Sequence, residues 1–225
     1  MAPTSPARAA ERLNDARHEQ ITSGLADRGF VVVPGFLARE PVTALRGEGA
    51  RRRAAGEFHA ASVGRAGTAE CAAPIRGDSI CWLGGRTSTA PECALLAHLH
   101  SLCVALNGAL FLGIAELEAH YACYPPGTGY VRHVDRFRDD AARVISLVLY
   151  LNDDWRDADG GALRIYATRD AHEPVCELPP RGGTLVAMRS EVIAHEVLPA
   201  NAERWSIAAW LRRRPRRRGH DDRSV

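Results

Sequence analysis

The strand-rich second half of this 225-residue chain is the feature that most constrains its fold. From Leu117 onward, short apolar or alternating runs are separated by Gly, Pro, Asn and Asp turns. The expected strands are Leu117–Tyr124, Arg143–Leu151, Ala162–Tyr166, Gly183–Met188 and Arg204–Leu211. Because these strands follow helical patterns instead of alternating with them, we expect an α+β fold with a mainly β core. The favoured architecture is an antiparallel double-sheet jelly-roll barrel, a double-stranded β-helix, supported by N-terminal helices.

Helical patterns occupy the first half of the chain. Residues 11–27 carry apolar side chains at near-helical spacing, and Pro41 suits the first turn of a helix that runs toward Arg53. A third helix begins at Pro91 and carries a stripe of four leucines at helical spacing: Leu95, Leu99, Leu102 and Leu106. Residues 56–73, rich in Gly, Ala and Ser, are expected to form a long loop.

The expected domain covers residues 11–211, with helical and loop support at 11–113 and the barrel core at 114–211. Residues 1–10 and the Arg-rich tail 212–225 are expected to be disordered. The tail holds seven of the 29 basic residues and two of the 27 acidic ones, so 22 basic and 25 acidic residues remain in the body. The tail could bind nucleic acid, but without interleaved aromatic residues a solvated end is the favoured interpretation.

The sequence shows neither a secretory signal nor an apolar run near the roughly 18 residues that a membrane span needs. We therefore expect a cytoplasmic protein with no membrane partner, and we expect it to be a monomer. Its six cysteines form no CxxC pair, so a zinc or thioredoxin-like site has no support and free thiols are expected.

The pattern that carries chemistry is the pair His133 and Asp135 in the segment GYVRHVD. Residues two apart on a strand point to the same face, so this imidazole and carboxylate can bind one metal ion from adjacent corners. With His195 as third ligand they would form the facial triad typical of non-haem Fe(II) oxygenases. Alone, however, such a pair is more commonly two polar residues on a surface strand. Three other histidines are interpreted as ordinary helix or strand residues: His98, His100 and His120.

Arg204 supports the oxygenase interpretation. It follows His195 by nine residues and begins an expected strand, so its guanidinium can face the barrel interior, where it would need an anion. A dicarboxylate co-substrate would supply that anion. Tyr150 could donate to the same carboxylate and Tyr124 could reach the metal side of the pocket, although both could equally be core aromatics.

Several segments resemble the prolyl-hydroxylase-domain family of Fe(II)/2-oxoglutarate-dependent oxygenases, which includes the animal oxygen-sensing prolyl hydroxylases and bacterial relatives. They are, in order, GFVVVPGFL, IRGDSICWLGG, CYPPGTGYVRHVD, YLNDDW, DGGALRIY and HEVLPANAERWSIAAW. The IRGD and PPGTGYVRHVD segments are more specific than the HxD…H…R frame, which many 2-oxoglutarate oxygenases share. The resemblance runs from Leu13 to Leu211.

The resemblance implies the roles of individual residues. The Fe(II) ligands would be His133, Asp135 and His195. The 2-oxoglutarate site would include Arg204 and Tyr150 at the distal carboxylate, Tyr124 near the chelating end and Trp210 in the wall. The substrate side would include Asp78, Arg76, Tyr130 and Arg143, and residues 56–73 would form a mobile finger over the substrate.

The resemblance also implies a reaction. A prolyl residue of a protein would be hydroxylated at C4, with consumption of O2 and 2-oxoglutarate and release of succinate and CO2. Ascorbate (vitamin C) would support turnover, and elongation factor Tu is a candidate substrate. Two departures stand out: Ala208 replaces a Thr that often contacts the co-substrate, and Arg136-Phe137 replaces the usual Asn-Pro. Two alternatives stay open, namely an oxygenase of nucleic-acid bases or small molecules guided by the tail, and a non-catalytic metal-binding module.

Overall fold

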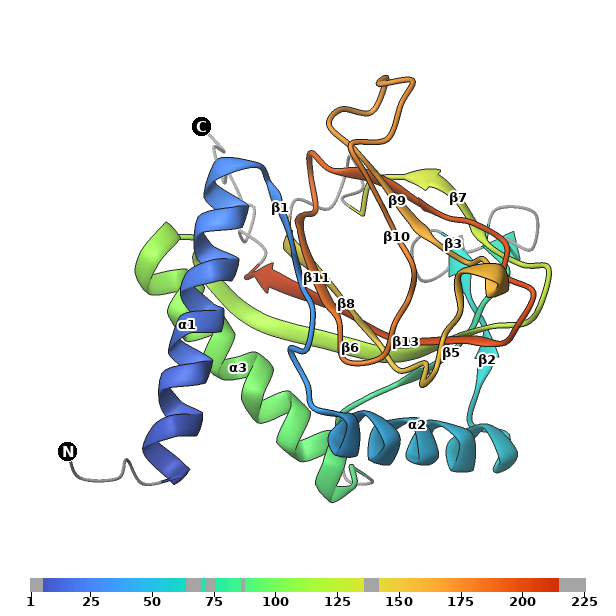
Figure 1. Ribbon diagram of the computed structural model, residues 1–225, viewed down its shortest axis with the longest axis horizontal. Helices are drawn as coiled ribbons and strands as arrows, with labels where there is room; N and C mark the ends of the chain where they lie inside the picture. The colour runs from blue at the N-terminus through green and yellow to red at the C-terminus, as the bar shows by residue number, and fades with distance from the viewer. Residues whose placement is uncertain (1–5, 64–69, 72–75, 86–87, 136–141, 215–225) are drawn as a thin grey trace, which may run out of the picture.

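The computed structural model describes residues 6–63, 70–71, 76–85, 88–135 and 142–214. Two sheets face each other as the halves of a flattened barrel (Figure 1). The seven-stranded sheet has the order β1 (Phe30–Val33), β11 (Leu185–Arg189), β8 (Arg143–Tyr150), β13 (Arg204–Arg213), β6 (Ile114–Tyr124), β5 (Ser79–Trp82) and β2 (His59–Ala60). The four-stranded sheet has the order β10 (Cys176–Leu178), β9 (Leu163–Tyr166), β12 (Ala194–Val197) and β7 (Tyr130–His133). A small separate pair joins β3 (Ser62–Val63) to β4 (Glu70–Cys71), and one 3-10 turn, η1, spans Asp157–Asp159.

Side-chain alternation along the central strands divides the interior into two layers. On β13, Trp205 and Ile207 point to the outer layer beneath the helices, whereas Arg204 and Ser206 line the space between the sheets. Successive residues of a strand face opposite sides, so one strand supplies both layers. The inner layer also takes apolar residues from both sheets, which closes the barrel: Ile80, Ala122, Leu163, Ile165, Val186 and Met188.

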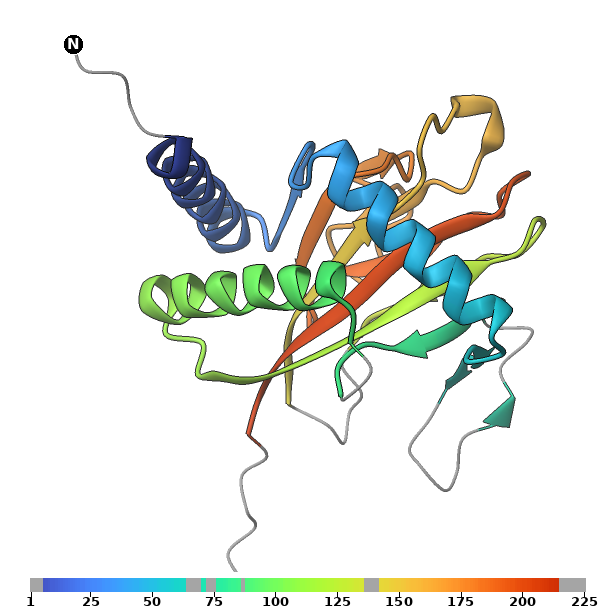
Figure 2. The ribbon, with the colours of Figure 1, turned by 90° about the horizontal axis from the view of Figure 1, so that it is seen from below.

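Three helices cover the outer face of the seven-stranded sheet: α1 (Pro6–Asp27), α2 (Arg39–Ala54) and α3 (Ala90–Leu110). Figure 2 shows α2 and α3 in front of its strands, and α1 packs against β1 and α3. The leucine stripe of α3 is buried as the sequence indicates. At the start of α3, Glu92 accepts a hydrogen bond from the Thr89 N–H at 2.9 Å and pairs with Arg52 of α2 at 2.8 Å. This buried ion pair fixes the two helices to each other.

The double-sheet barrel and its helical support agree with the sequence-based expectation, but several boundaries differ. The first helix begins at Pro6, five residues before the expected start, and residues 1–5 lie outside the described part. The region 56–73 was interpreted as a continuous loop, whereas it contains β2, β3 and β4. The last strand continues through Arg213, so Arg212 belongs to the sheet and pairs with Glu118 instead of starting a tail. With two residues each, β2, β3 and β4 are too short to show a period in the sequence.

By length and composition, α3 is long and apolar enough to cross a membrane. No apolar run of this length was expected from the sequence. The length and composition of α3 are weak evidence for a membrane span, because the core helix of a folded domain passes the same test. Here the leucine stripe contacts the sheet, so the apolar character has a structural reason.

Candidate active site

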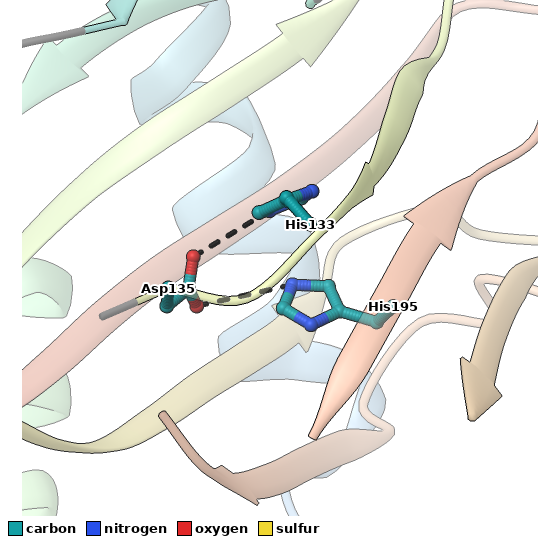
Figure 3. A group of neighbouring side chains, drawn as sticks. All are labelled: His133, Asp135 and His195. Carbon is teal, nitrogen blue, oxygen red and sulfur yellow. Dashed lines mark ion pairs between the residues drawn. The ribbon is translucent and has the colours of Figure 1, made fainter. Parts of the chain in front are cut away.

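Two histidines are brought together by strand pairing. β7 and β12 are antiparallel, and His133 lies directly opposite His195 in their register. The two imidazole ring centroids are 4.3 Å apart. Asp135 follows β7 by two residues at a bend, and its carboxylate turns toward both rings (Figure 3). The sixty-residue separation of the two histidines in the sequence is therefore closed by one pair of neighbouring strands.

The three side chains offer a compact set of metal donors. The Nε2 atom of His133 lies 3.5 Å from one Asp135 carboxylate oxygen, and the Nε2 atom of His195 lies 3.8 Å from the other. One ligand atom from each residue lies within 4.8 Å of those of the other two. Each ring also donates from Nδ1 to a backbone carbonyl, at Val131 and Ile193 respectively. These bonds select the tautomer in which both Nε2 atoms carry a lone pair toward the same point.

Charge in this cluster suits a divalent cation. Burial is the main reason that the pKa of His195 falls to about 4, and the neighbouring His133 lowers it further. Burial would raise the pKa of Asp135, but the interactions with the neighbouring His133 and His195 outweigh it, so this pKa lies well below its usual range. Neutral imidazole and ionised carboxylate are the forms that bind metal. Two histidines and one carboxylate form the donor set of a non-haem Fe(II) centre, so the residues fit that ion.

A cavity of about 390 Å³ extends from the cluster into the barrel. Arg204, at the start of β13, lines it and is 1% exposed. Its Nε atom donates to the Gly161 carbonyl at 3.0 Å, whereas its Nη2 atom has no hydrogen-bond partner among the described residues. Because a buried guanidinium without a counter-ion is costly, this arrangement fits an anionic ligand, such as the carboxylate of 2-oxoglutarate.

The aromatic residues expected around the co-substrate lie near Arg204. Its guanidinium carbon is 5.3 Å from the Tyr124 ring centroid and 5.1 Å from that of Tyr150. Tyr124 lines the cavity, whereas Tyr150 is buried behind Arg204. Within the described part of the chain the Tyr150 hydroxyl has no partner, and burial raises its pKa to about 12. Trp210 lines the wall, and its Nε1 atom is likewise unpartnered there.

The four residues expected on the substrate side all line the same cavity: Arg76, Asp78, Tyr130 and Arg143. Arg76 and Asp78 form a two-bond ion pair at 2.7 and 2.6 Å. Tyr130 stacks on His133 with ring centroids 3.6 Å apart, and Arg143 lies 3.8 Å above the Trp210 ring. Arg76 and Asp78 therefore neutralise each other, and their pair holds the shape of the wall.

The cavity wall also contains residues that sequence reasoning did not assign to the site, among them His59, Trp82 and His120. Trp82 and His120 face each other across β5 and β6, so strand alternation could have placed them on the cavity side. His120 was interpreted as an ordinary strand residue, whereas it lies in the wall. Ala208 lies in the wall as well, next to Ser206 on the same face of β13. The departure at Arg136-Phe137 falls outside the described residues.

Comparisons with known proteins identify the family. A family model described as the 2OG-Fe(II) oxygenase superfamily matches residues 119–212. A prolyl-4-hydroxylase of Pseudomonas putida is 40% identical, with a TM-score of 0.76, and the match covers 88% of this chain and 100% of that one. The chain belongs to the prolyl-hydroxylase family of 2-oxoglutarate and Fe(II) oxygenases. Its barrel is accordingly the double-stranded β-helix of these enzymes, as the order of strands indicates.

Animal members of the prolyl-hydroxylase family are also similar to this chain. A Trichoplax adhaerens prolyl hydroxylase, solved with a peptide of the hypoxia inducible factor oxygen degradation domain, is 28% identical. Its TM-score is 0.81 and the match covers 94% of each chain. Human Egl nine homolog 1 is 32% identical over 201 residues, which is 85% of this chain and 46% of that protein. The chain thus spans about half the length of the curated relatives it matches.

Proposed function

We propose that this protein is an Fe(II)- and 2-oxoglutarate-dependent dioxygenase that hydroxylates C4 of a prolyl residue in a protein substrate. The observation that carries the proposal is one cavity shared by the His133, Asp135 and His195 cluster and by Arg204, whose Nη2 atom has no hydrogen-bond partner among the described residues. When bound, the iron and 2-oxoglutarate would supply the chemistry that consumes O2, releases succinate and CO2, and adds one oxygen atom to the substrate.

The residues of the chain have binding and positioning roles in this proposal. His133, Asp135 and His195 would hold the iron through two Nε2 atoms and a carboxylate, and their Nδ1 hydrogen bonds keep the rings oriented. Arg204 would bind the distal carboxylate of 2-oxoglutarate through Nη2 with Tyr150 beside it, and the buried wall excludes water from the reacting groups. Ala208 provides no hydroxyl, so Ser206 is the neighbouring donor on this face.

A protein substrate is supported by the shape and chemistry of the cavity rim. Trp82 and Val131 line the cavity and are each about half exposed, so the opening presents an apolar surface to solvent. Trp210 and Tyr130 supply further aromatic wall, against which a pyrrolidine ring can pack. The P. putida and Trichoplax relatives are prolyl hydroxylases, and the latter was solved with a peptide. We propose elongation factor Tu as the candidate protein substrate.

Further parts of the proposal are the cytoplasm as its location, a monomeric state, support of turnover by ascorbate, and a role in oxygen sensing like that of the animal relatives. These parts rest on the resemblance and on the sequence. Oxygen sensing would require that the rate respond to O2 over the physiological range, so the dependence of turnover on O2 concentration is the measurement for it.

Peptide mass spectrometry tests the proposed function. Elongation factor Tu is incubated with the protein, Fe(II), 2-oxoglutarate and ascorbate, and a gain of one oxygen atom on a proline is expected. The His133→Ala variant is the control and should give no gain, because the metal loses one of three protein ligands. Oxygen added to another residue type, or to nucleic acid, would overturn the prolyl assignment. Removal of residues 215–225 then decides whether the tail guides substrate, since this cut leaves β13 intact.

A further inference from the structure

His120 occupies a central place in the cavity wall that the proposed mechanism does not use. It lies in the middle of β6, opposite Trp82 of β5 on one side and Ala208 of β13 on the other. All three side chains line the cavity. The imidazole packs edge-on against Trp82, with ring centroids 5.1 Å apart, and its centroid lies 5.2 Å from that of the Trp210 ring. Ala208 has no atoms beyond Cβ, so it is the smallest of the neighbours of the imidazole in this wall.

The hydrogen bonds of His120 fix what this ring offers to the cavity. Its Nδ1 atom lies 2.9 Å from the carbonyl oxygen of Tyr121. A carbonyl can only accept, so Nδ1 carries the proton and Nε2 of the neutral ring is an acceptor. Among the described residues no group donates to this Nε2 atom, although His120 is 1% exposed. Burial lowers the pKa of His120 to about 4, so the ring is neutral near physiological pH.

The Nε2 atom of His120, an acceptor without a donor in the wall, favours a ligand that carries an N–H or O–H group at this point. 2-Oxoglutarate is not the donor, because its carboxylates and keto group carry no N–H or O–H near neutral pH. The target proline is not the donor either, because a prolyl residue has no backbone N–H. The amides of the residues beside the proline do carry N–H groups, and an extended peptide at the rim would turn alternate amides toward the wall. Amide to imidazole is an ordinary neutral hydrogen bond.

We propose that His120 is a positioning residue for the peptide substrate, whose Nε2 atom accepts a hydrogen bond from a backbone N–H beside the target proline. This inference rests on the proposed function. The bond would set the register of the peptide, so that one proline and not a neighbouring residue faces the His133, Asp135 and His195 cluster. Recognition would also be partly independent of the substrate side chains, because this hydrogen bond is made to the peptide main chain.

The test measures peptide affinity and turnover separately. The probe is a synthetic segment of elongation factor Tu centred on the proline that the wild-type protein hydroxylates. Its Kd is measured by calorimetry without O2, in the presence of Fe(II) and 2-oxoglutarate. His120→Leu keeps an apolar contact with Trp82 and Trp210 but has no acceptor, and it should weaken peptide binding by about tenfold. His120→Gln places an amide oxygen near the Nε2 position and should recover most of that loss. The peptide Kd is compared at saturating 2-oxoglutarate, because His120 also lies beside Trp210 of the co-substrate wall.

A second peptide series identifies the amide and does not depend on the variants folding. Backbone amides on either side of the proline are N-methylated one at a time, which removes the donor. One position should cost the wild-type protein about tenfold in Kd, and the same methyl group should cost His120→Leu almost nothing. If every methylated peptide binds the wild type as well as the parent, or if methylation costs both proteins equally, His120 does not position the peptide. If the wild type hydroxylates no proline at all, the proposed function fails, and this inference fails with it.

Discussion

Replacing Arg204 with Met should separate co-substrate binding from stability. In the ligand-free protein, Arg204 is buried, forms no ion pair within the described part of the chain and makes one hydrogen bond, to Gly161. Met fills similar space without a charge that needs a counter-ion. The free energy of unfolding should therefore change by no more than about 1 kcal/mol, which is a shift in Tm of about 4 °C at most for a chain of this size.

The affinity for 2-oxoglutarate, in contrast to the stability, should fall strongly in Arg204→Met. Loss of the guanidinium leaves the distal carboxylate buried without its partner, which costs about 3–5 kcal/mol. The half-saturating concentration should rise on the order of a hundred- to a thousandfold. Thermal unfolding without ligand, followed by succinate release at rising 2-oxoglutarate, measures both quantities. The increase in Tm that 2-oxoglutarate gives the wild type should be absent from the variant.

Arg76→Met is the matched control, because Arg76 is an arginine of the same cavity, with a side chain only 12% exposed, but it has a partner. Its removal leaves Asp78, whose side chain is fully buried, as an unpaired carboxylate. We expect a loss of about 3 kcal/mol and a fall in Tm of about 6–12 °C. Equal losses of Tm in the two variants, together with an unchanged response of Arg204→Met to 2-oxoglutarate, would refute the assignment of Arg204 to the co-substrate.

Three further predictions concern the metal, pH and backbone packing. His133→Ala should lose Fe(II) binding, measured by metal analysis after dialysis, while its far-UV circular dichroism is unchanged; retained stoichiometric iron would contradict the site. The pKa of His120 is lowered from 6.5 to about 4, so the unfolded chain binds the proton more strongly, and stability is lost as pH falls from 6.5 toward 4. Urea unfolding should show that the free energy of unfolding of His120→Leu falls by about 3 kcal/mol less than that of the wild type over this pH interval. An equal fall in the two proteins would contradict the lowered pKa of His120. Gly129→Ala should separate β7 from β12 and lower iron affinity, because its Cβ would lie 2.4 Å from the Val197 carbonyl oxygen, whereas Gly47→Ala, with open space around it, should bind iron normally.

The clustering of His133, Asp135 and His195 could be predicted from the sequence because strand periodicity is a strong local constraint. His133 and Asp135 could be paired from their spacing on one expected strand. His195 could be named as the third donor because it follows an apolar strand. The leucine stripe of α3 was predicted for the same reason, since a 3.6-residue period over three turns is unambiguous. In each case the deciding information lay within a few residues.

The rest of the cavity depended on contacts between distant segments. β5 and β2 have four and two residues, too few for a period. They become strands because β5 pairs with β6 and β2 pairs with β5. The pairing of β5 with β6 places Trp82 beside His120. Arg76 and Asp78 were placed by resemblance, but their mutual ion pair follows from the buried position of the segment. The exact ends of α1 and β13 were missed because neighbours, not local pattern, set them.

The geometry of β13 explains why substitutions in one strand should have opposite consequences. Arg204, Ser206 and Ala208 face the cavity, whereas the residues between them pack beneath the helices. A slip of one residue in its register would exchange the two sets, placing an indole in the cavity and a guanidinium in the core. Register is held by pairing with both β6 and β8, so the strand is fixed from two sides. Substitutions at Trp205 or Ile207 should therefore lower stability at little direct cost to binding, and those on the cavity face should do the reverse. The core-facing residues of β13 thus hold Arg204 in its place in the cavity wall, and one strand serves both the core and the cavity through alternate residues.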